Sequence, residues 1–457
     1  MTTFQGPIHL VGVGGMHMSA IAQLLLQQGV AVTGSDLRPS ALTERVQALG
    51  GAVVFGHAAK NIGHPTLVVT TAAAADDNPE ISEARRRGIP VILRAEMVAR
   101  LMEGKRVIAV AGSHGKTTTS SLIAFILSEA GLRPMYLLGG DSHDLKGNAA
   151  WGEGEWCVVE ADEYKRAFLE YAPEISVILN AEPDHLDYYG TAEAYQQAFV
   201  EFAGLTVNGG LLLTCSEDDG ASRAANDATL GAGVRRQTYG VVGDPTWRAD
   251  SPEIADGAAR FGVVRSGEAI GSLTIHRPAM HLVLNALVAT AVCLHAGVEF
   301  DTIKDAIDRF RGARRRMDFT GEARGITVYD DYAHHPSEVV ATIKEARARF
   351  PGRRLIGIHQ PHTYSRISYL WENWTQCWDG LDELFILETY AAREQPVAGR
   401  GARELAIAIV SPKARYVADF DAAARAAVSS AQDGDVIFTI GAGDVVEVGP
   451  KILELLR

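Results

Sequence analysis

The sequence predicts an α/β protein with parallel sheets in more than one domain, and three observations support this. Short apolar runs typical of strands alternate with helix-like runs through most of the chain. The 457 residues exceed what one hydrophobic core ordinarily organises, so two or three domains are expected. Glycine-rich segments at 12–15 and 112–115 each join a strand-like run to a helix-like run, as nucleotide-binding turns do.

Composition narrows the function classes. Apolar residues make up 47% of the chain and charged residues 22%, both typical of globular proteins. The net charge of −13 argues against a nucleic-acid partner, because it would repel phosphates. The chain opens without a basic signal region, and its apolar runs fall short of the roughly 18 residues of a membrane helix. We therefore expect a cytoplasmic protein without membrane contact, whose four scattered cysteines are buried free thiols.

The first block of predicted elements runs from Ile8 to about Gly104. A helix is expected over 18–28, and strands over 8–13, 30–36, 53–54, 67–71 and 91–93. The glycine turn opens the helix, and Asp36 ends the following strand. This arrangement predicts a site for a nucleotide diphosphate in which Asp36 meets a ribose hydroxyl. An NAD-type dinucleotide would fit as well, and a turn that serves packing alone is the alternative.

The second block begins at Val107 and contains the most informative loop of the chain. Between its first strand and a helix over 120–128 stands Gly112-Ser113-His114-Gly115-Lys116-Thr117-Thr118. The free backbone N–H groups of such a turn, together with the positive end of the helix dipole, bind phosphate. Lys116 can reach the β- and γ-phosphates, and the Thr117 hydroxyl can join a Mg²⁺ shell. Although Val110 replaces a glycine of the full motif, the loop predicts ATP binding rather than a plain tight turn.

Two polar clusters follow later strands of this block. Glu160, Asp162 and Glu163 stand at the end of the strand over 156–160, and 182–187 follows the strand over 175–180. Carboxyl ends of parallel strands beside a phosphate loop are where Mg²⁺ ligands belong. Either cluster alone could be a solvated loop, but the two together predict a metal–phosphate site. The block continues with a strand over 210–213, an antiparallel accessory sheet within 206–275 and a helix over 282–297.

The third block follows an arginine-rich boundary at 312–325. Its strands are expected over 326–331, 355–359, 383–387, 414–417 and 436–440. The first of them ends in two acids followed by His334 and His335, which suggests ribose or phosphate contacts. We do not expect this histidine pair to bind a transition metal, because no further Cys or His ligands stand nearby in the sequence. Arg366 follows another strand end and is a candidate clamp for a carboxylate, with a surface arginine as the alternative.

These motifs, in this order and over nearly the whole chain, resemble the Mur ligases of peptidoglycan synthesis. The resemblance rests on the residues already quoted and on further ordered matches: Gly34-Ser35-Asp36, Gly56-His57, Arg94-Ala95-Glu96-Met97, Asp184-His185-Leu186-Asp187, Arg315-Arg316, Asp331-Tyr332-Ala333-His334-His335-Pro336, Gln360-Pro361-His362, Tyr390 with Glu394, and Gly441-Ala442-Gly443-Asp444.

The resemblance implies three domains. Residues 1–104 form a Rossmann-like domain for a UDP-sugar, 105–318 a P-loop-type ATPase domain, and 319–457 a second Rossmann-like domain. It implies catalytic roles for Lys116, Glu160 and His185, of which the last two are Mg²⁺ ligands with Thr117. The remaining implied contacts are, for ATP, the loop from Gly112 to Thr118 with Asn285, Arg316 and Asp331; for the UDP-sugar, Gly14, Gly15, Met18, Ser19, Asp36, His57 and Thr71; and for the amino acid, His335 and Arg366.

The implied reaction is amide-bond formation in cell-wall precursor synthesis. The carboxylate of UDP-N-acetylmuramate would attack the γ-phosphate of ATP, and the amine of L-alanine would then displace phosphate from the acyl-phosphate. The resemblance leaves open a monomer or a homodimer. The nearest alternative is a ligase that joins a recycled murein tripeptide to the same sugar. A nicotinamide-dependent oxidoreductase would leave the loop at 112–118 unexplained, and a nucleotide-binding regulator would bind ATP without turnover.

Four positions depart from the family pattern: His17, Lys165, Leu282 and Thr363. His17 stands where a small residue is usual beside the diphosphate, and Lys165 adds a positive charge near the metal site. Leu282 and Thr363 replace residues expected near the adenine and the amino acid. Because none of them removes a phosphate or metal group, they bear on substrate contacts and not on the type of reaction.

Overall fold

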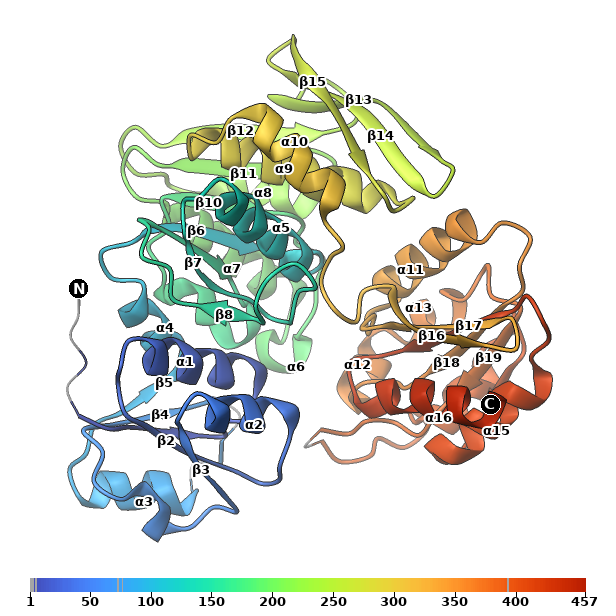
Figure 1. Ribbon diagram of the computed structural model, residues 1–457, viewed down its shortest axis with the longest axis horizontal. Helices are drawn as coiled ribbons and strands as arrows, with labels where there is room; N and C mark the ends of the chain where they lie inside the picture. Colours follow the sequence, from blue (N-terminus) through green and yellow to red (C-terminus); the bar gives the residue numbers. More distant parts are fainter. Residues whose placement is uncertain (1–3, 5, 72–73, 76, 393) are drawn as a thin grey trace.

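The computed structural model describes residues 4, 6–71, 74–75, 77–392 and 394–457 and confirms an α/β protein of three domains. Each domain is built on its own sheet, and the three sheets follow one another along the chain (Figure 1). Their strands span 8–93, 106–275 and 318–440. The predicted domain bounds themselves stay a prediction.

The first domain has a five-stranded parallel sheet in the order β3-β2-β1-β4-β5. β1 is the middle strand and β4 lies next to it. Every residue of both strands is buried, as expected for inner strands of a sheet. The glycine turn follows β1, beside the point where the strand order reverses, which is where such sheets bind ligands. The elements are β1 (Ile8–Val11), α1 (Met16–Gln27), β2 (Val32–Asp36), α2 (Ala41–Ala48), β3 (Ala52–Phe55), the 3₁₀ helix η1 (Ala59–Ile62), β4 (Leu67–Thr70), α3 (Pro79–Arg86), β5 (Val91–Leu93) and α4 (Arg94–Leu101).

The central domain has a ten-stranded sheet in the order β15-β14-β13-β12-β11-β10-β6-β9-β7-β8. β6 lies deep within it, flanked by β10 and β9, so the phosphate loop and both acidic clusters leave neighbouring strands. Its strands are β6 (Arg106–Ala111), β7 (Met135–Leu137), β8 (Ala149–Ala150), β9 (Trp156–Glu160), β10 (Ile175–Ile178), β11 (Leu211–Cys215), β12 (Arg235–Gly240), β13 (Trp247–Ala255), β14 (Ala258–Arg265) and β15 (Glu268–Ile275). Its helices are α5 (Lys116–Glu129), η2 (Tyr164–Glu170), α6 (Leu186–Tyr189), α7 (Ala192–Gly204), α8 (Asp219–Asp227), α9 (Met280–His295) and α10 (Phe300–Arg309).

The accessory sheet predicted within 206–275 is antiparallel only in part. β13, β14 and β15 form an antiparallel meander, but β11 and β12 pair in parallel with their neighbours. The meander is joined edge to edge to β12 and therefore extends the central sheet rather than forming one of its own (Figure 1).

The C-terminal domain has a six-stranded sheet in the order β16-β17-β21-β18-β19-β20. The edge strand β16 runs antiparallel to β17, and the other neighbours are parallel. Its strands are β16 (Asp318–Ala323), β17 (Ile326–Asp331), β18 (Leu355–His359), β19 (Glu383–Ile386), β20 (Ala414–Tyr416) and β21 (Val436–Ile440). Its helices are α11 (Pro336–Arg349), α12 (Tyr364–Tyr369), α13 (Trp371–Gln376), α14 (Ala402–Ala408), α15 (Phe420–Ser430), η3 (Asp444–Glu447) and α16 (Val448–Leu456).

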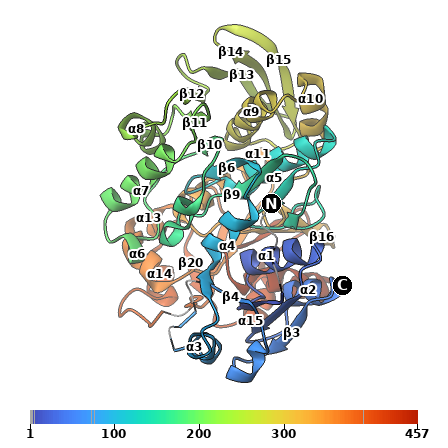
Figure 2. The same ribbon diagram turned by 90° about the vertical axis from the view of Figure 1, so that its left-hand side faces the viewer.

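The two domain junctions differ in character. One buried apolar cluster runs from the first domain into the central domain, and it contains Met18 and Leu25 of α1 as well as Met135 and Phe199. The C-terminal domain keeps two apolar clusters of its own, drawn from residues 317–456. It contacts the central domain through charged pairs, as detailed below. Residues of α5, α9 and the start of α11 line a cavity. Figure 2 shows these three helices in the same part of the view.

Two predictions from composition can be checked here. All four cysteines, Cys157, Cys215, Cys293 and Cys377, are free and buried, as expected. Within the described ranges, no helix combines the length and the apolar character that crossing a bilayer requires.

Candidate active site

The phosphate loop lies between β6 and α5, as the sequence predicts. Gly115 immediately precedes α5 with φ +84°, a left-handed conformation that suits glycine. The side chain of Lys116 folds back over the loop, where its Nζ lies 2.8 Å from Oε2 of Glu163 and also contacts the Gly112 carbonyl oxygen. The loop therefore holds a largely buried ammonium group at the N-terminus of α5, which is a site for an anion.

Thr117 and Glu160 meet at one side of the loop. The Thr117 hydroxyl donates to Oε2 of Glu160 at 2.8 Å, and the backbone N–H of Gly139 donates to the same oxygen at 2.9 Å. A Cβ on Gly139 would lie 2.5 Å from both carboxylate oxygens, so the Glu160 carboxylate can occupy this position only because residue 139 is a glycine. A hydroxyl and a carboxylate are the hard oxygen donors that Mg²⁺ prefers, and the residues present fit that ion.

Glu163 is a site residue whose position the sequence alone did not reveal. Its carboxylate lies between Nζ of Lys116 and, at 3.7 Å, Nε2 of His185. Burial raises the pKa of Glu163, whereas the pKa of Lys116 is raised because the neighbouring carboxylates outweigh its own burial. His185 is held with φ +53°, an uncommon backbone conformation for a non-glycine residue and typical of functional sites. Of the predicted metal ligands, Glu160 contacts Thr117 and His185 contacts Glu163.

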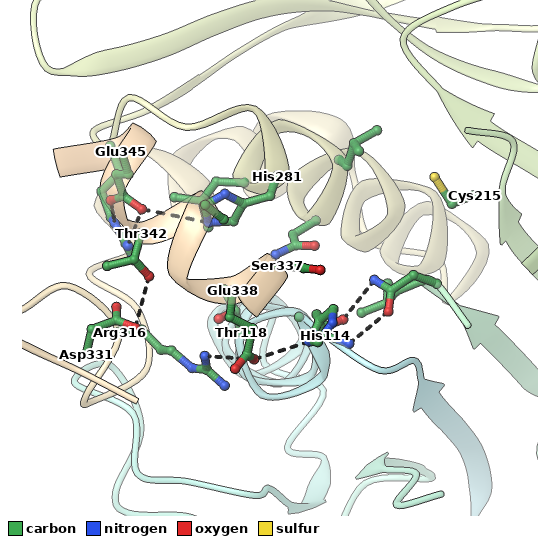
Figure 3. A pocket seen from close by; sticks show the side chains of 18 of the residues that line it. His114, Thr118, Cys215, His281, Arg316, Asp331, Ser337, Glu338, Thr342 and Glu345 are labelled. Carbon is green, nitrogen blue, oxygen red and sulfur yellow. Dashed lines mark hydrogen bonds and ion pairs between the residues drawn. The ribbon is translucent and has the colours of Figure 1, made fainter. Parts of the chain in front are cut away.

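A cavity of about 260 Å³ opens beside the loop between α5, α9 and α11 (Figure 3). The predicted ATP contacts His114, Gly115, Thr118, Asn285, Arg316 and Asp331 all line it. Apolar side chains, among them Leu179 and Leu282, line it too. Burial raises the pKa of Asp331 to about 6, although the backbone N–H groups of Met317 and Ala333 donate to its carboxylate. This mixture of apolar walls and convergent polar groups is typical of a nucleotide site.

His335 lies beside the phosphate loop. Its ring packs against that of His114, with centroids 4.8 Å apart. Glu182 joins them, with Oε2 3.0 Å from Nε2 of His114. The fold thus brings two potential metal ligands, His114 and Glu182, to His335 from distant parts of the sequence. The predicted role of His335 toward the amino acid, together with Arg366, stays a prediction.

A second cavity, of about 970 Å³, is lined by all three domains. Arg38 comes from the first domain, His185 from the central domain and Arg366 from the C-terminal domain. The Arg366 guanidinium is paired with the Asp184 carboxylate at 3.1 Å, and both side chains are 8% exposed. His362, whose Nδ1 lies 3.1 Å from Nη1 of Arg366, lines the cavity as well. Arg366, the predicted amino-acid clamp, therefore lines the same cavity as His185, a predicted metal ligand.

The glycine turn of the first domain uses Asp36 internally. One carboxylate oxygen of Asp36 accepts from the Gly14 backbone N–H at 2.7 Å, and the other from the backbone N–H of Leu37. Met18 and Ser19 are buried in α1, and the Ser19 hydroxyl donates to the Met16 carbonyl oxygen. Thr71 lies opposite Gly12. The roles of these residues toward a UDP-sugar stay predictions.

A buried carboxylate that the sequence analysis did not single out positions His57. Glu80 of α3 is fully buried and accepts from the Ser35 hydroxyl at 2.5 Å and from the Asn61 amide at 2.6 Å. His57 contacts the same group: its Nδ1 lies 3.1 Å from the Ser35 hydroxyl oxygen and 3.5 Å from the Glu80 carboxylate. A polar residue on a short helix gives no sequence signal of such burial.

Three family models match successive parts of the chain. They are the Mur ligase family catalytic domain over residues 7–106, the Mur ligase middle domain over 110–293, and the Mur ligase glutamate ligase domain over 315–443. The three matches follow the order of the three sheets.

Relatives match over the whole length. The chain is 42% identical over 455 residues to the UDP-N-acetylmuramate–L-alanine ligase of Anaeromyxobacter dehalogenans, covering 99% of this chain and 98% of the relative. It is 41% identical over 453 residues to the ligase of the same name from Trichlorobacter lovleyi, covering 98% of each. Among solved structures, UDP-N-acetylmuramate-alanine ligase MurC from Thermotoga maritima aligns with a TM-score of 0.84 at 28% identity, covering 99% of both chains. A murein peptide ligase from Psychrobacter arcticus shares the fold with a TM-score of 0.75 at 24% identity, covering 99% of both chains. The chain belongs to the Mur ligase family.

Proposed function

We propose that this chain is an ATP-dependent ligase that joins the carboxylate of UDP-N-acetylmuramate to the amine of L-alanine. Its family membership supports an amide-forming ligase. The choice of L-alanine is supported by relatives of that name at 42% and 41% identity over nearly the whole chain. The residues assigned below to each substrate are part of the proposal.

The observation that carries the proposal is that the phosphate loop lines one cavity and is joined to the other by a chain of side-chain contacts. On one side, His114, Gly115 and Thr118 line the smaller cavity, which suits the adenosine part of ATP. On the other side, Lys116 contacts Glu163, and Glu163 faces His185 in the three-domain cavity. A nucleotide seated on the loop would therefore direct its terminal phosphate toward the cavity that is large enough for a sugar and an amine.

This arrangement suits phosphoryl transfer to a carboxylate. A carboxylate is a poor acylating agent, so its oxygen first attacks the γ-phosphorus and ADP leaves, which gives an acyl-phosphate. Lys116 neutralises the charge on the transferring phosphate oxygens. Thr117, Glu160 and His185 would hold Mg²⁺, which supplies further positive charge at these oxygens. The alanine nitrogen then attacks the acyl carbon, and inorganic phosphate departs.

Arg366 would bind the carboxylate of the incoming amino acid. Its guanidinium donates to Asp184 and contacts His362, and these two contacts hold the planar donor group in one orientation in the cavity. Holding the amine in a fixed orientation supplies part of the rate enhancement of a two-substrate reaction. Because the three sites belong to three domains, the reaction requires them to close around the substrates.

Phosphate release tests the proposal. The full chain is incubated with ATP, Mg²⁺ and UDP-N-acetylmuramate, and release is compared with L-alanine, with the tripeptide L-Ala-γ-D-Glu-meso-diaminopimelate, and without an amine. We expect release that depends on L-alanine. Release only with the tripeptide would assign the chain to cell-wall recycling, and ATP binding without release in any mixture would contradict a ligase.

A further inference from the structure

We propose that His114, Glu182 and His335 form a binding site for a divalent transition-metal ion of the Zn²⁺ class, distinct from the Mg²⁺ site predicted at Thr117 and Glu160. The inference goes beyond the proposed function and does not depend on it.

The first observation is the geometry of the three side chains. One potential ligand atom of each lies within 4.8 Å of the others. Nε2 of His114 is 3.0 Å, and Nδ1 of His335 is 4.0 Å, from Oε2 of Glu182. Ligand atoms on a tetrahedral Zn²⁺ ion lie roughly 3.3 Å apart, as follows from bonds of about 2.05 Å. The two distances from the histidine nitrogens to the carboxylate oxygen, 3.0 and 4.0 Å, lie just below and just above this value. A small rotation of the His335 ring brings its nitrogen to the distance that a bound ion would set.

The second observation is an unsatisfied polar atom. His335 is 1% exposed, and in the part of the chain that the structure describes its Nε2 has no hydrogen-bond partner. Its Nδ1 lies 3.4 Å from the Ser337 backbone nitrogen, a long hydrogen bond, and 4.0 Å from Oε2 of Glu182. Buried imidazole nitrogens are normally hydrogen-bonded, because leaving one unpaired costs free energy. Neither ring nitrogen of His335 therefore has a short hydrogen bond, and a metal ion on the Glu182 side supplies a partner for one of them.

The third observation is the support behind the ligand atoms. Nδ1 of His114 lies 3.4 Å from the Glu338 carboxylate, so the other ring nitrogen, Nε2, is the one that faces Glu182. The second carboxylate oxygen of Glu182, Oε1, accepts from the Ser337 hydroxyl at 2.6 Å. Metal-binding histidines usually have such a carboxylate behind the second ring nitrogen, and ligating carboxylates are in turn hydrogen-bonded. Both outer partners, Ser337 and Glu338, come from the first turn of α11.

The kind of ion follows from the donor set. Two imidazoles and one carboxylate, with water in the fourth position, suit Zn²⁺ and Co²⁺ and not Mg²⁺, which prefers oxygen ligands. The ligands also come from two domains, because His114 and Glu182 belong to the central domain and His335 to the C-terminal domain. A bound ion therefore links the phosphate loop to the start of α11 at the edge of the nucleotide cavity.

Cobalt binding to the full chain tests the inference. Co²⁺ is titrated in the absence of nucleotide and Mg²⁺, and binding is followed by the visible absorption that four-coordinate Co²⁺ shows and hydrated Co²⁺ lacks. We expect one strongly absorbing ion per chain, displaced by Zn²⁺ and retained in a large excess of Mg²⁺. His335→Gln and Glu182→Gln, which keep the side-chain size, are expected to abolish the absorption.

Two control variants locate the ion. His276 and Asp308 form an exposed pair of the same kind, 3.0 Å apart, so His276→Gln is expected to leave the absorption unchanged. Glu160→Gln removes the predicted Mg²⁺ ligand and is expected to retain it too. Thermal melting of each variant checks that it is folded, and if one of the two ligand variants does not fold the other carries the test. The inference is overturned if wild-type protein binds no four-coordinate Co²⁺, or if the absorption survives in a folded His335→Gln or Glu182→Gln variant.

Discussion

Gly139→Ala is expected to lower kcat strongly while changing the stability of the fold little. The new Cβ would lie 2.5 Å from both carboxylate oxygens of Glu160, and ordinary van der Waals contact begins at 3.4 Å. The carboxylate must therefore withdraw by about 0.9 Å from its place beside Thr117. Only the end of one side chain has to move, so we expect little loss of stability.

The effect on rate is much larger than the effect on stability. A displacement of about 1 Å of a catalytic group costs about 100-fold in rate, which corresponds to about 2.7 kcal/mol of transition-state stabilisation. We expect a fall of that order in kcat for phosphate release with L-alanine, together with a higher Mg²⁺ requirement. Calorimetric titration with ADP should change little, because the cavity lined by Asn285 and Asp331 lies on the other side of the loop.

Gly140→Ala is the matched control. Its Cβ would meet only the Thr117 methyl group, at 3.4 Å, so activity should stay close to that of the unaltered chain. If both alanine variants retain normal activity and a normal Mg²⁺ requirement, the position of Glu160 does not matter for catalysis, and its role as a metal ligand is refuted.

Three further predictions follow from buried charges. Lys116→Ala should abolish phosphate release but leave calorimetric binding of UDP-N-acetylmuramate nearly intact, because the proposed sugar site belongs to the first domain and Lys116 to the central one. Asp184→Asn leaves the buried Arg366 guanidinium without a counter-charge, so we expect a loss of about 3 kcal/mol in thermal or denaturant unfolding. Burial alone would raise the pKa of Glu80, but hydrogen bonds from His9, Ser35 and Asn61 lower it to about 2. Ionised Glu80 therefore stabilises the fold above its unfolded pKa near 4.5, and this contribution is lost as the pH falls toward 2. The difference in melting temperature between wild type and Glu80→Gln should shrink over that range.

Each of these has an outcome that would contradict it. Retained ligase activity in Lys116→Ala would remove the lysine from the phosphate site. An unchanged melting curve for Asp184→Asn would mean that Arg366 is solvated in solution. A melting difference at Glu80→Gln that does not vary with pH would show that the carboxyl is neutral in the fold.

The sequence was most informative where a structure depends on neighbouring residues. The strands ending at Glu160, Asp331, His359 and Ile440 are found with the bounds predicted, because apolar runs flanked by polar residues mark buried parallel strands. The phosphate loop was predictable for the same reason, since strand, glycine turn and helix are contiguous. Two edge strands, β8 and β16, were not predicted, because β8 has only two residues and β16 pairs antiparallel within the arginine-rich boundary segment.

Side-chain partners could be predicted only within a loop. The ribose contact of Asp36 stays a prediction, and the sequence did not reveal that its carboxylate also accepts from the Gly14 backbone N–H within the glycine turn. Nor did it reveal that the approach of the central domain places the ring of His335 against that of His114. The partners of Glu80 and Glu163 come from distant parts of the sequence, and only the folded chain brings them together.

The contrast between the two domain junctions has a consequence for how solvent acts on the molecule. The first junction combines a continuous apolar cluster with ion pairs such as Arg94 with Asp162, whereas the second is held by charged pairs such as Arg366 with Asp184. Ammonium sulfate strengthens apolar burial and so stabilises the first junction, but it screens the Arg366–Asp184 pair only weakly, because both side chains are 8% exposed. Raising the concentration of this salt therefore tightens the unit of the first two domains more than it changes the attachment of the C-terminal domain, without altering a single residue.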